Sequence, residues 1–200
     1  ISFSEISKTK GAINSILIFL IYTHIETLGG VWIASYFFLI KQVDYSTAAL
    51  FTSVFYLVFA IGRALFGLIS MKVHPHRLIL LGECIMMLAG VLMLFQFQSL
   101  WPYFIIVGVF GLGAAPVYPN MMFMNSQHFE SRKLSRIMSL QMAIGYMGIG
   151  VLTPLAGVFF RHFSIQIYPY FVIGMALFLF VITARFFRLF PQKNHQEHQA

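Results

Sequence analysis

Long apolar stretches separated by short polar ones divide the 200-residue chain into six segments. We place these segments at residues 13–39, 47–71, 78–97, 101–124, 136–160 and 167–190. Each has about the 20 mainly apolar residues that a helix needs to cross a bilayer. Backbone groups in hydrocarbon must be satisfied within such a segment, and the runs do not alternate as barrel strands do. The pattern therefore predicts an all-α membrane protein with six transmembrane helices.

The composition agrees with lipid as the solvent. Hydrophobic residues make up 59% of the chain and charged residues 10%, whereas soluble domains have about a quarter charged residues. The single cysteine, Cys84, excludes an intrachain disulfide framework and a Cys-rich metal site. The loop histidines are expected to be solvated rather than to bind metal, and we expect no metal and no cofactor.

The basic residues indicate the orientation of the chain. With six spans both ends lie on one side, and that side carries ten Lys and Arg residues: Lys8, Lys10, Lys72, Arg77, Arg132, Lys133, Arg136, Arg185, Arg188 and Lys193. The other side carries only Lys41 and Arg161, and Arg63 lies within a span. Because short cytoplasmic loops are rich in Lys and Arg, we place both termini in the cytoplasm, with residues 191–200 as a disordered tail. The formal charge of +7 is then a topology signal, and we expect no nucleic-acid partner.

Polar side chains are unevenly distributed among the spans. The first, second, fourth and fifth carry several, whereas the third and sixth are nearly bare. Polar groups within a membrane normally face a bundle interior or a watery cavity. We therefore expect four spans to face inward and two to face lipid, a pattern that suggests a three-helix unit used twice.

Glu26 lies near the middle of the first span, where a charged acid costs about 2.5–3.5 kcal/mol. It is interpreted as a substrate-binding or proton-coupled group; the alternative is a structural acid paired with a neighbouring helix. Tyr22 lies four residues earlier on nearly the same helix face. Gly29 and Gly30 permit a kink or break one turn later.

Further aromatic residues suit a sugar, which has apolar faces and polar edges. Trp32 and Tyr36 follow the glycines of the first span, and Tyr56 lies in the second. For Trp32 and Tyr36, ordinary packing is an equally open reading, and Tyr36 also suits a position at the membrane interface.

The stretch 62–77, "GRALFGLISMKVHPHR", closes the second span and leads into the third. Gly62 and Gly67 would let helices approach closely. Arg63 and Glu83 flank the loop at similar depth in antiparallel helices, so we predict that they pair. The pair would be either a cytoplasmic latch or a static salt bridge.

Two later stretches combine small residues, prolines and amides. "GVFGLGAAPVYPN", 108–120, predicts close helix packing followed by a kink, with Tyr118 and Asn120 beside a cavity or merely beside the kink. In the fifth span, Gln141 would reach the substrate or form a helix–helix hydrogen bond. No HExxH, GxSxG or Walker-type sequence occurs, so we do not expect an enzyme or an ATP-driven pump.

The stretch 62–77 resembles the loop motif of the major facilitator superfamily in Gly62, Arg63, Gly67, Leu68, Lys72, Pro75 and Arg77. Met71 replaces the usual Asp, which weakens any latch that relies on that acid. Tyr22, Glu26, Gly30, Trp32 and Tyr36 resemble the seventh helix of fucose-permease-like sugar transporters, and "GLGAAPVYPN" resembles their tenth.

The resemblance implies that the six spans are the C-terminal half of a twelve-helix transporter in the cell membrane. An N-terminal six-helix half would complete a central site for substrate and protons. We expect a proton-linked secondary transporter of a small polar solute, a sugar, working by alternating access. The alternatives are an efflux or facilitator member of the same superfamily, or a non-transporting membrane protein such as an embedded enzyme or a receptor.

Overall fold

The computed structural model describes residues 3–190, and every regular element in this range is helical. The elements are α1 (Phe3–Ser7), α2 (Ala12–Thr27), a π-helical turn (Leu28–Trp32), α3 (Ile33–Ile40), α4 (Tyr45–Ile69), α5 (Pro75–Met93), α6 (Trp101–Ala114), α7 (Val117–His128), α8 (Ser131–Phe163), a 3-10 turn (Ile165–Ile167) and α9 (Tyr168–Leu189). The expected tail, residues 191–200, lies outside the described residues.

Six helical stretches in the described range are long and apolar enough to cross a membrane. They are Ala12–Ile40, Tyr45–Ile69, Pro75–Met93, Trp101–His128, Ser131–Phe163 and Ile165–Leu189. The prediction of six spans is therefore confirmed. The largest difference in bounds is at the fifth span, which begins at Ser131 rather than near 136. A helix can continue past the hydrocarbon through Arg132 and Lys133, so charged residues end the apolar run without ending the helix.

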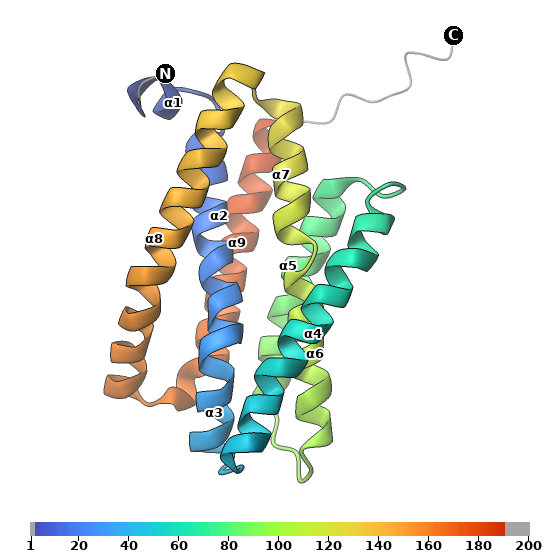
Figure 1. Cartoon of the computed structure of the whole chain (residues 1–200), viewed down its shortest axis with the longest axis vertical. Helices are drawn as coiled ribbons and strands as arrows, with labels where there is room; N and C mark the ends of the chain where they lie inside the picture. The colour runs from blue at the N-terminus through green and yellow to red at the C-terminus, as the bar shows by residue number, and fades with distance from the viewer. Residues whose placement is uncertain (1–2, 191–200) are drawn as a thin grey trace.

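The six spans pack as one bundle (Figure 1). α2 packs against α8 and α9, α4 packs against α6, and α5 lies between α6 and α9. In Figure 1, α8 and α4 lie at the two flanks of the viewed face, with α2 and α7 between them. The start of α2 and the end of α9 meet at the same end of the bundle, where the Phe190 ring packs against Gly11. This arrangement leaves α2, α4, α7 and α8 to share one face.

The first span is interrupted by the π-helical turn at Leu28–Trp32, where the sequence predicts a kink or break. π-turns are rare in proteins, and those that occur are often found at functional sites. A methyl group on Gly29 would collide with the Phe55 ring, and one on Gly30 would collide with the Tyr56 hydroxyl. The Tyr168 hydroxyl donates a hydrogen bond of 3.1 Å to the Leu28 carbonyl. The glycines thus let α4 approach the turn, and α9 satisfies one of its carbonyls.

The fourth span is also interrupted, between the end of α6 at Ala114 and the start of α7 at Val117. Pro116 and Pro119 supply no N–H to the helix ladder, so the carbonyls four residues before them lack their usual donor. The Asn120 side-chain amide donates to the Pro116 carbonyl at 2.7 Å. The first and fourth spans, which are the first members of the two predicted three-helix units, are therefore both broken.

The loop between α3 and α4 ends in a capped helix start. Asp44 is the N-cap of α4 and accepts hydrogen bonds from the Ser46 hydroxyl and from the Thr47 hydroxyl and N–H. These bonds favour the ionised carboxylate and hold the pKa of Asp44 below its ordinary value. The cap fixes where the second span begins.

Candidate functional site

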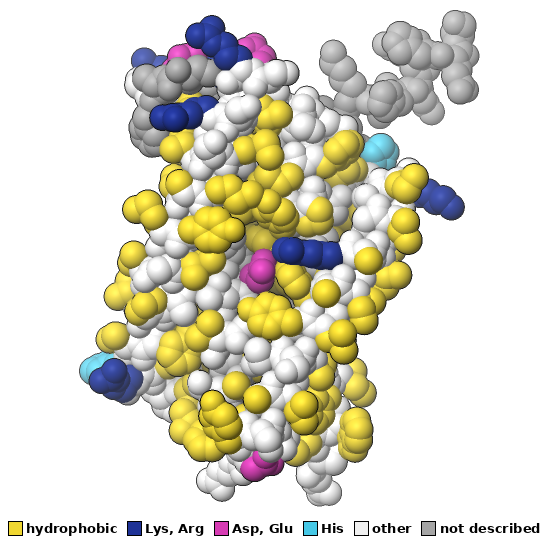
Figure 2. All heavy atoms as spheres, viewed as in Figure 1, with side chains coloured by type: hydrophobic (Ala, Val, Ile, Leu, Met, Phe, Trp, Pro, Cys, Tyr) yellow, Lys and Arg dark blue, Asp and Glu magenta, His cyan; other side chains and the backbone are white. Residues whose placement is uncertain are grey.

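A cavity of about 260 Å³ opens in the middle of the face that α2, α4, α7 and α8 share. Its lining residues are Phe19, Tyr22, Thr23, Glu26, Thr27, Arg63, Tyr118, Met142, Tyr146 and Ile149. Figure 2 shows one acidic and one basic side chain meeting in a hollow at the centre of this face. All ten lining residues belong to the four spans expected to face inward, and α5 and α9 contribute none.

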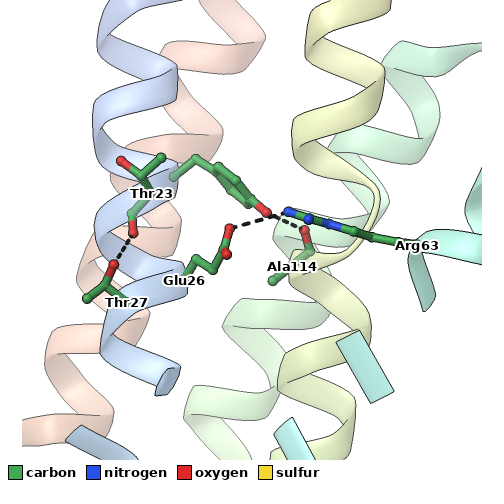
Figure 3. A network of polar contacts seen from close by, with 6 residues as sticks. Thr23, Glu26, Thr27, Arg63 and Ala114 are labelled. Carbon is green, nitrogen blue, oxygen red and sulfur yellow. Dashed lines mark hydrogen bonds and ion pairs between the residues drawn. The ribbon is translucent and has the colours of Figure 1, made fainter. Parts of the chain in front are cut away.

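Glu26 and Arg63 form an ion pair across this cavity. They extend toward each other from α2 and α4 (Figure 3), with 3.6 Å between Arg63 Nη2 and Glu26 Oε2. The Arg63 side chain is 40% exposed and that of Glu26 is 27% exposed, so both remain open to the cavity. The two charges compensate each other at membrane depth while staying accessible to a solute.

The predicted pair of Arg63 with Glu83 is wrong. Glu83 is fully buried, and its Oε1 accepts a hydrogen bond of 2.6 Å from the Thr183 hydroxyl. Similar depth in neighbouring helices is not sufficient for contact, because each side chain also has a direction around its helix axis. Arg63 faces α2, whereas Glu83 faces α9.

Two aromatic rings hold the Arg63 guanidinium in place. Its central carbon lies 4.2 Å from the centre of the Phe59 ring and 5.6 Å from that of Tyr118. Such stacking stabilises a cation and fixes the plane of its donors. The guanidinium is therefore oriented by its surroundings even though much of it is exposed.

Tyr22 joins the Glu26 face of α2 to the break in the fourth span. It is 1% exposed, and its hydroxyl donates a 3.1 Å hydrogen bond to the Ala114 carbonyl. Ala114 is the last residue of α6, so its carbonyl is among those that a helix end leaves without a partner. The predicted proximity of Tyr22 and Glu26 on one helix face is confirmed, since both line the cavity.

Tyr36 and Trp32, which were also predicted for the site, lie outside this cavity. Tyr36 is 4% exposed and packs against Tyr168, and the Trp32 ring contacts Phe160 and Gly157. An uninterrupted helix would return to nearly the same face after the fourteen residues from Tyr22 to Tyr36, because a turn takes 3.6 residues. The π-turn places one more residue in a turn and so rotates the remainder of the span away from that face.

Tyr56 lies beside Gly30 and is not a lining residue, although it is 44% exposed. Asn120, 4% exposed, supports the break in the fourth span. Tyr118, in contrast, does line the cavity.

Gln141 forms a helix–helix hydrogen bond, the second of its two predicted roles. It belongs to a closed, fully buried ring with Ser15 and Asn125. The Ser15 hydroxyl donates to Asn125 at 2.6 Å, the Asn125 amide donates to Gln141 at 3.1 Å, and the Gln141 amide donates back to Ser15 at 2.7 Å. The ring ties α2, α7 and α8 together on the side of the cavity toward the chain ends.

The loop-motif residues differ in their surroundings. Gly62 is buried against Ala115 and Leu112, as expected for close packing. A methyl group placed on Gly67 would have no neighbour within 4 Å among the described residues, so the prediction of close packing there is wrong. Lys72 and Arg77 are exposed near the turn between α4 and α5.

Three polar lining residues were not predicted as site residues: Thr23, Thr27 and Tyr146. A signal for the first two was present, since positions 19, 22, 23, 26 and 27 form the stripe of one helix face. A larger hollow of about 540 Å³ is lined by Arg132, Ser135, Arg136 and Ser139 of α8 alone. It lies near the start of α8 and lacks walls from other helices, so the central cavity is the stronger candidate.

Comparison with known proteins assigns the family. No curated protein matches the chain. The family model described as Major Facilitator Superfamily matches residues 11–200, nearly the whole sequence. With its six candidate spans, the chain is a multi-pass membrane transporter that belongs to the Major Facilitator Superfamily.

Proposed function

We propose that the chain is the C-terminal half of a proton-coupled secondary transporter that moves a sugar by alternating access, of the fucose-permease-like branch. The observation that carries this proposal is the accessible Glu26–Arg63 pair in a cavity bordered by four spans. Charged groups are retained within a membrane mainly where they serve a substrate or ion path.

The walls of the cavity suit a small polar solute. Its volume of about 260 Å³ lies just below the roughly 300–1,000 Å³ typical of small-molecule sites. The rings of Phe19, Tyr118 and Tyr146 offer apolar surfaces beside the carboxylate and the hydroxyls. A sugar matches this mixture, with C–H faces against the rings and hydroxyls toward the polar groups. Glu26 would anchor the solute or carry the proton, and Tyr22 would keep the α2 wall in place.

A second six-helix half would close the site from the open side. The cavity lies on the surface of the bundle, on the face of α2, α4, α7 and α8. In this proposal the partner half covers that face, both ends of the present segment are cytoplasmic, and the transporter lies in the cell membrane. Rocking of the two halves would expose the cavity to each side in turn.

Uptake into proteoliposomes that contain this six-helix half together with its N-terminal half tests the proposal. We expect a labelled hexose to accumulate when the lumen is alkaline, and accumulation to collapse with a protonophore. Hexose equilibration without accumulation would identify a facilitator, and proton-driven extrusion of a dye in place of hexose uptake would identify an efflux protein. Either result contradicts the proposal.

A further inference from the structure

The α2 wall of the cavity presents hydrogen-bond acceptors and no free donors. The Thr23 hydroxyl donates to Leu20 O at 3.0 Å. The Thr27 hydroxyl donates to Thr23 O at 2.7 Å, as Figure 3 shows. The Tyr22 hydroxyl donates to Ala114 O. Each hydroxyl has a single proton. The two threonine hydroxyls can therefore only accept from a solute, as can the Glu26 carboxylate in its ion pair, and the Tyr22 hydroxyl is buried within the wall.

The α4 wall has the opposite character. Arg63 carries five N–H donors and no acceptor. One edge of its guanidinium contacts Glu26, the Phe59 ring supports its face, and 40% of the side chain remains exposed. Arg63 therefore presents donors of fixed direction to the same cavity.

The charge balance disfavours an ionic solute. Glu26 and Arg63 already neutralise each other at 3.6 Å. An anion at Arg63 would separate this pair and place its own lone pairs against the acceptors of α2. A cation at Glu26 would lie beside the guanidinium. The remaining polar lining groups, the hydroxyls of Tyr118 and Tyr146, are neutral and able to donate or accept.

We propose that Arg63 is a specificity-determining residue that orients an uncharged, polyhydroxylated solute. Arg63 donates hydrogen bonds to oxygens of the solute, and hydroxyls of the solute donate to the acceptors of the α2 wall. This inference rests on the proposed function, since it concerns the solute of the same cavity. It moves Arg63 from the conformational loop motif to the substrate site. It also assigns a direction to each hydrogen bond, which makes it testable with analogues of one sugar.

Binding to the purified protein, with both six-helix halves present, is measured for a panel of D-hexoses. For each hexose that binds, the measurement is repeated with analogues in which a single hydroxyl is replaced by hydrogen or by fluorine. Fluorine accepts weakly and cannot donate. Hydroxyls that face α2 should lose binding with either replacement. Hydroxyls that face Arg63 should lose it with hydrogen but largely keep it with fluorine. Each lost bond to a charged group should weaken binding about 10- to 100-fold.

Variants of Arg63 test whether the hydroxyls that tolerate fluorine but not hydrogen are the ones that face Arg63. In Arg63→Met those positions should become insensitive to replacement by hydrogen, whereas the α2-facing positions stay sensitive. Arg63→Lys keeps the positive charge but loses the planar fork of donors, so it should give an intermediate profile. It is also the control for a loss of folding in Arg63→Met. Arg161→Gln, an exposed arginine outside the cavity, is the matched control and should leave the profile unchanged.

Two results would overturn the inference. One is Arg63-dependent binding of glucuronate or succinate that is tighter than that of any neutral hexose. The other is an analogue profile that Arg63→Met does not alter. A hexose bound with the expected profile but not transported would contradict the proposed function and leave this inference standing. Proton-driven uptake of succinate would contradict this inference and leave alternating access standing.

Discussion

Two carboxyl groups at membrane depth, Glu26 and Glu83, have opposite environments. Glu26 is 27% exposed, pairs with Arg63 and borders a cavity. Glu83 is fully buried between α5 and α9, and its Oε2 has no hydrogen-bond partner among the described residues. An acid within a span is therefore not by itself a sign of transport, because a single hydroxyl can accommodate it inside a helix interface. Accessibility to a shared cavity is what distinguishes the transport candidate.

The largest effect should follow from removing the accessible acid. Glu26→Ala deprives Arg63 of its partner and the solute of a charged acceptor, so uptake should fall about 10- to 100-fold. Glu26→Gln keeps the shape and should separate binding from proton dependence. Initial rates of hexose uptake, normalised to folded protein, provide the measurement. Wild-type uptake in Glu26→Ala would remove Glu26 from the transport path.

A labelling experiment compares the two environments directly. In a Cys84→Ser background, Thr27→Cys lies in the cavity and Thr183→Cys lies beside the sealed Glu83. A water-soluble thiol reagent should modify the cavity position at least about tenfold faster, because reactivity follows access and thiolate formation. Equal rates would mean that water reaches both acids, and the comparison would fail.

Removing the sealed acid should affect stability and leave transport unchanged. Glu83→Ala leaves the Thr183 hydroxyl without its acceptor and should lower the free energy of unfolding by about 1–3 kcal/mol. Glu83→Gln retains an acceptor oxygen and is the matched control. Thermal unfolding in detergent measures the loss, and uptake per folded molecule should match that of the wild type. A transport defect in Glu83→Gln would give this acid a role that its burial does not suggest.

The smallest effect concerns an acid outside the membrane. The pKa of Asp44 is lowered because its N-cap hydrogen bonds stabilise the ionised carboxylate. Its contribution to stability is therefore present above the ordinary carboxyl pKa and is lost as the pH falls through the lowered value. Asp44→Asn should retain the cap and lose this pH dependence, whereas Asp44→Ala should lose both. Unfolding temperatures between neutral and acidic pH test the difference.

The spans were predictable because a bilayer imposes a minimum length on every apolar run. The stripe that holds Tyr22 and Glu26 was predictable because it repeats at the spacing of a helix. The partner of Arg63 was not, since depth can be counted along the sequence but the rotation of one helix against another cannot. The positions of Trp32 and Tyr36 depend on the π-turn. Gly29 and Gly30 indicate that the helix is weakened there, but not how its register shifts.

The hydrogen bond between Tyr22 and Ala114 joins the two interrupted spans at the level of the cavity. It now measures 3.1 Å, and beyond about 3.5 Å it would no longer be a hydrogen bond. Any bending of the fourth span at its prolines must therefore either pull α2 along with it or release the tyrosine. Releasing it would return one proton donor to a wall that otherwise has only acceptors, so the shape of the backbone and the chemistry offered to the cargo are mechanically linked.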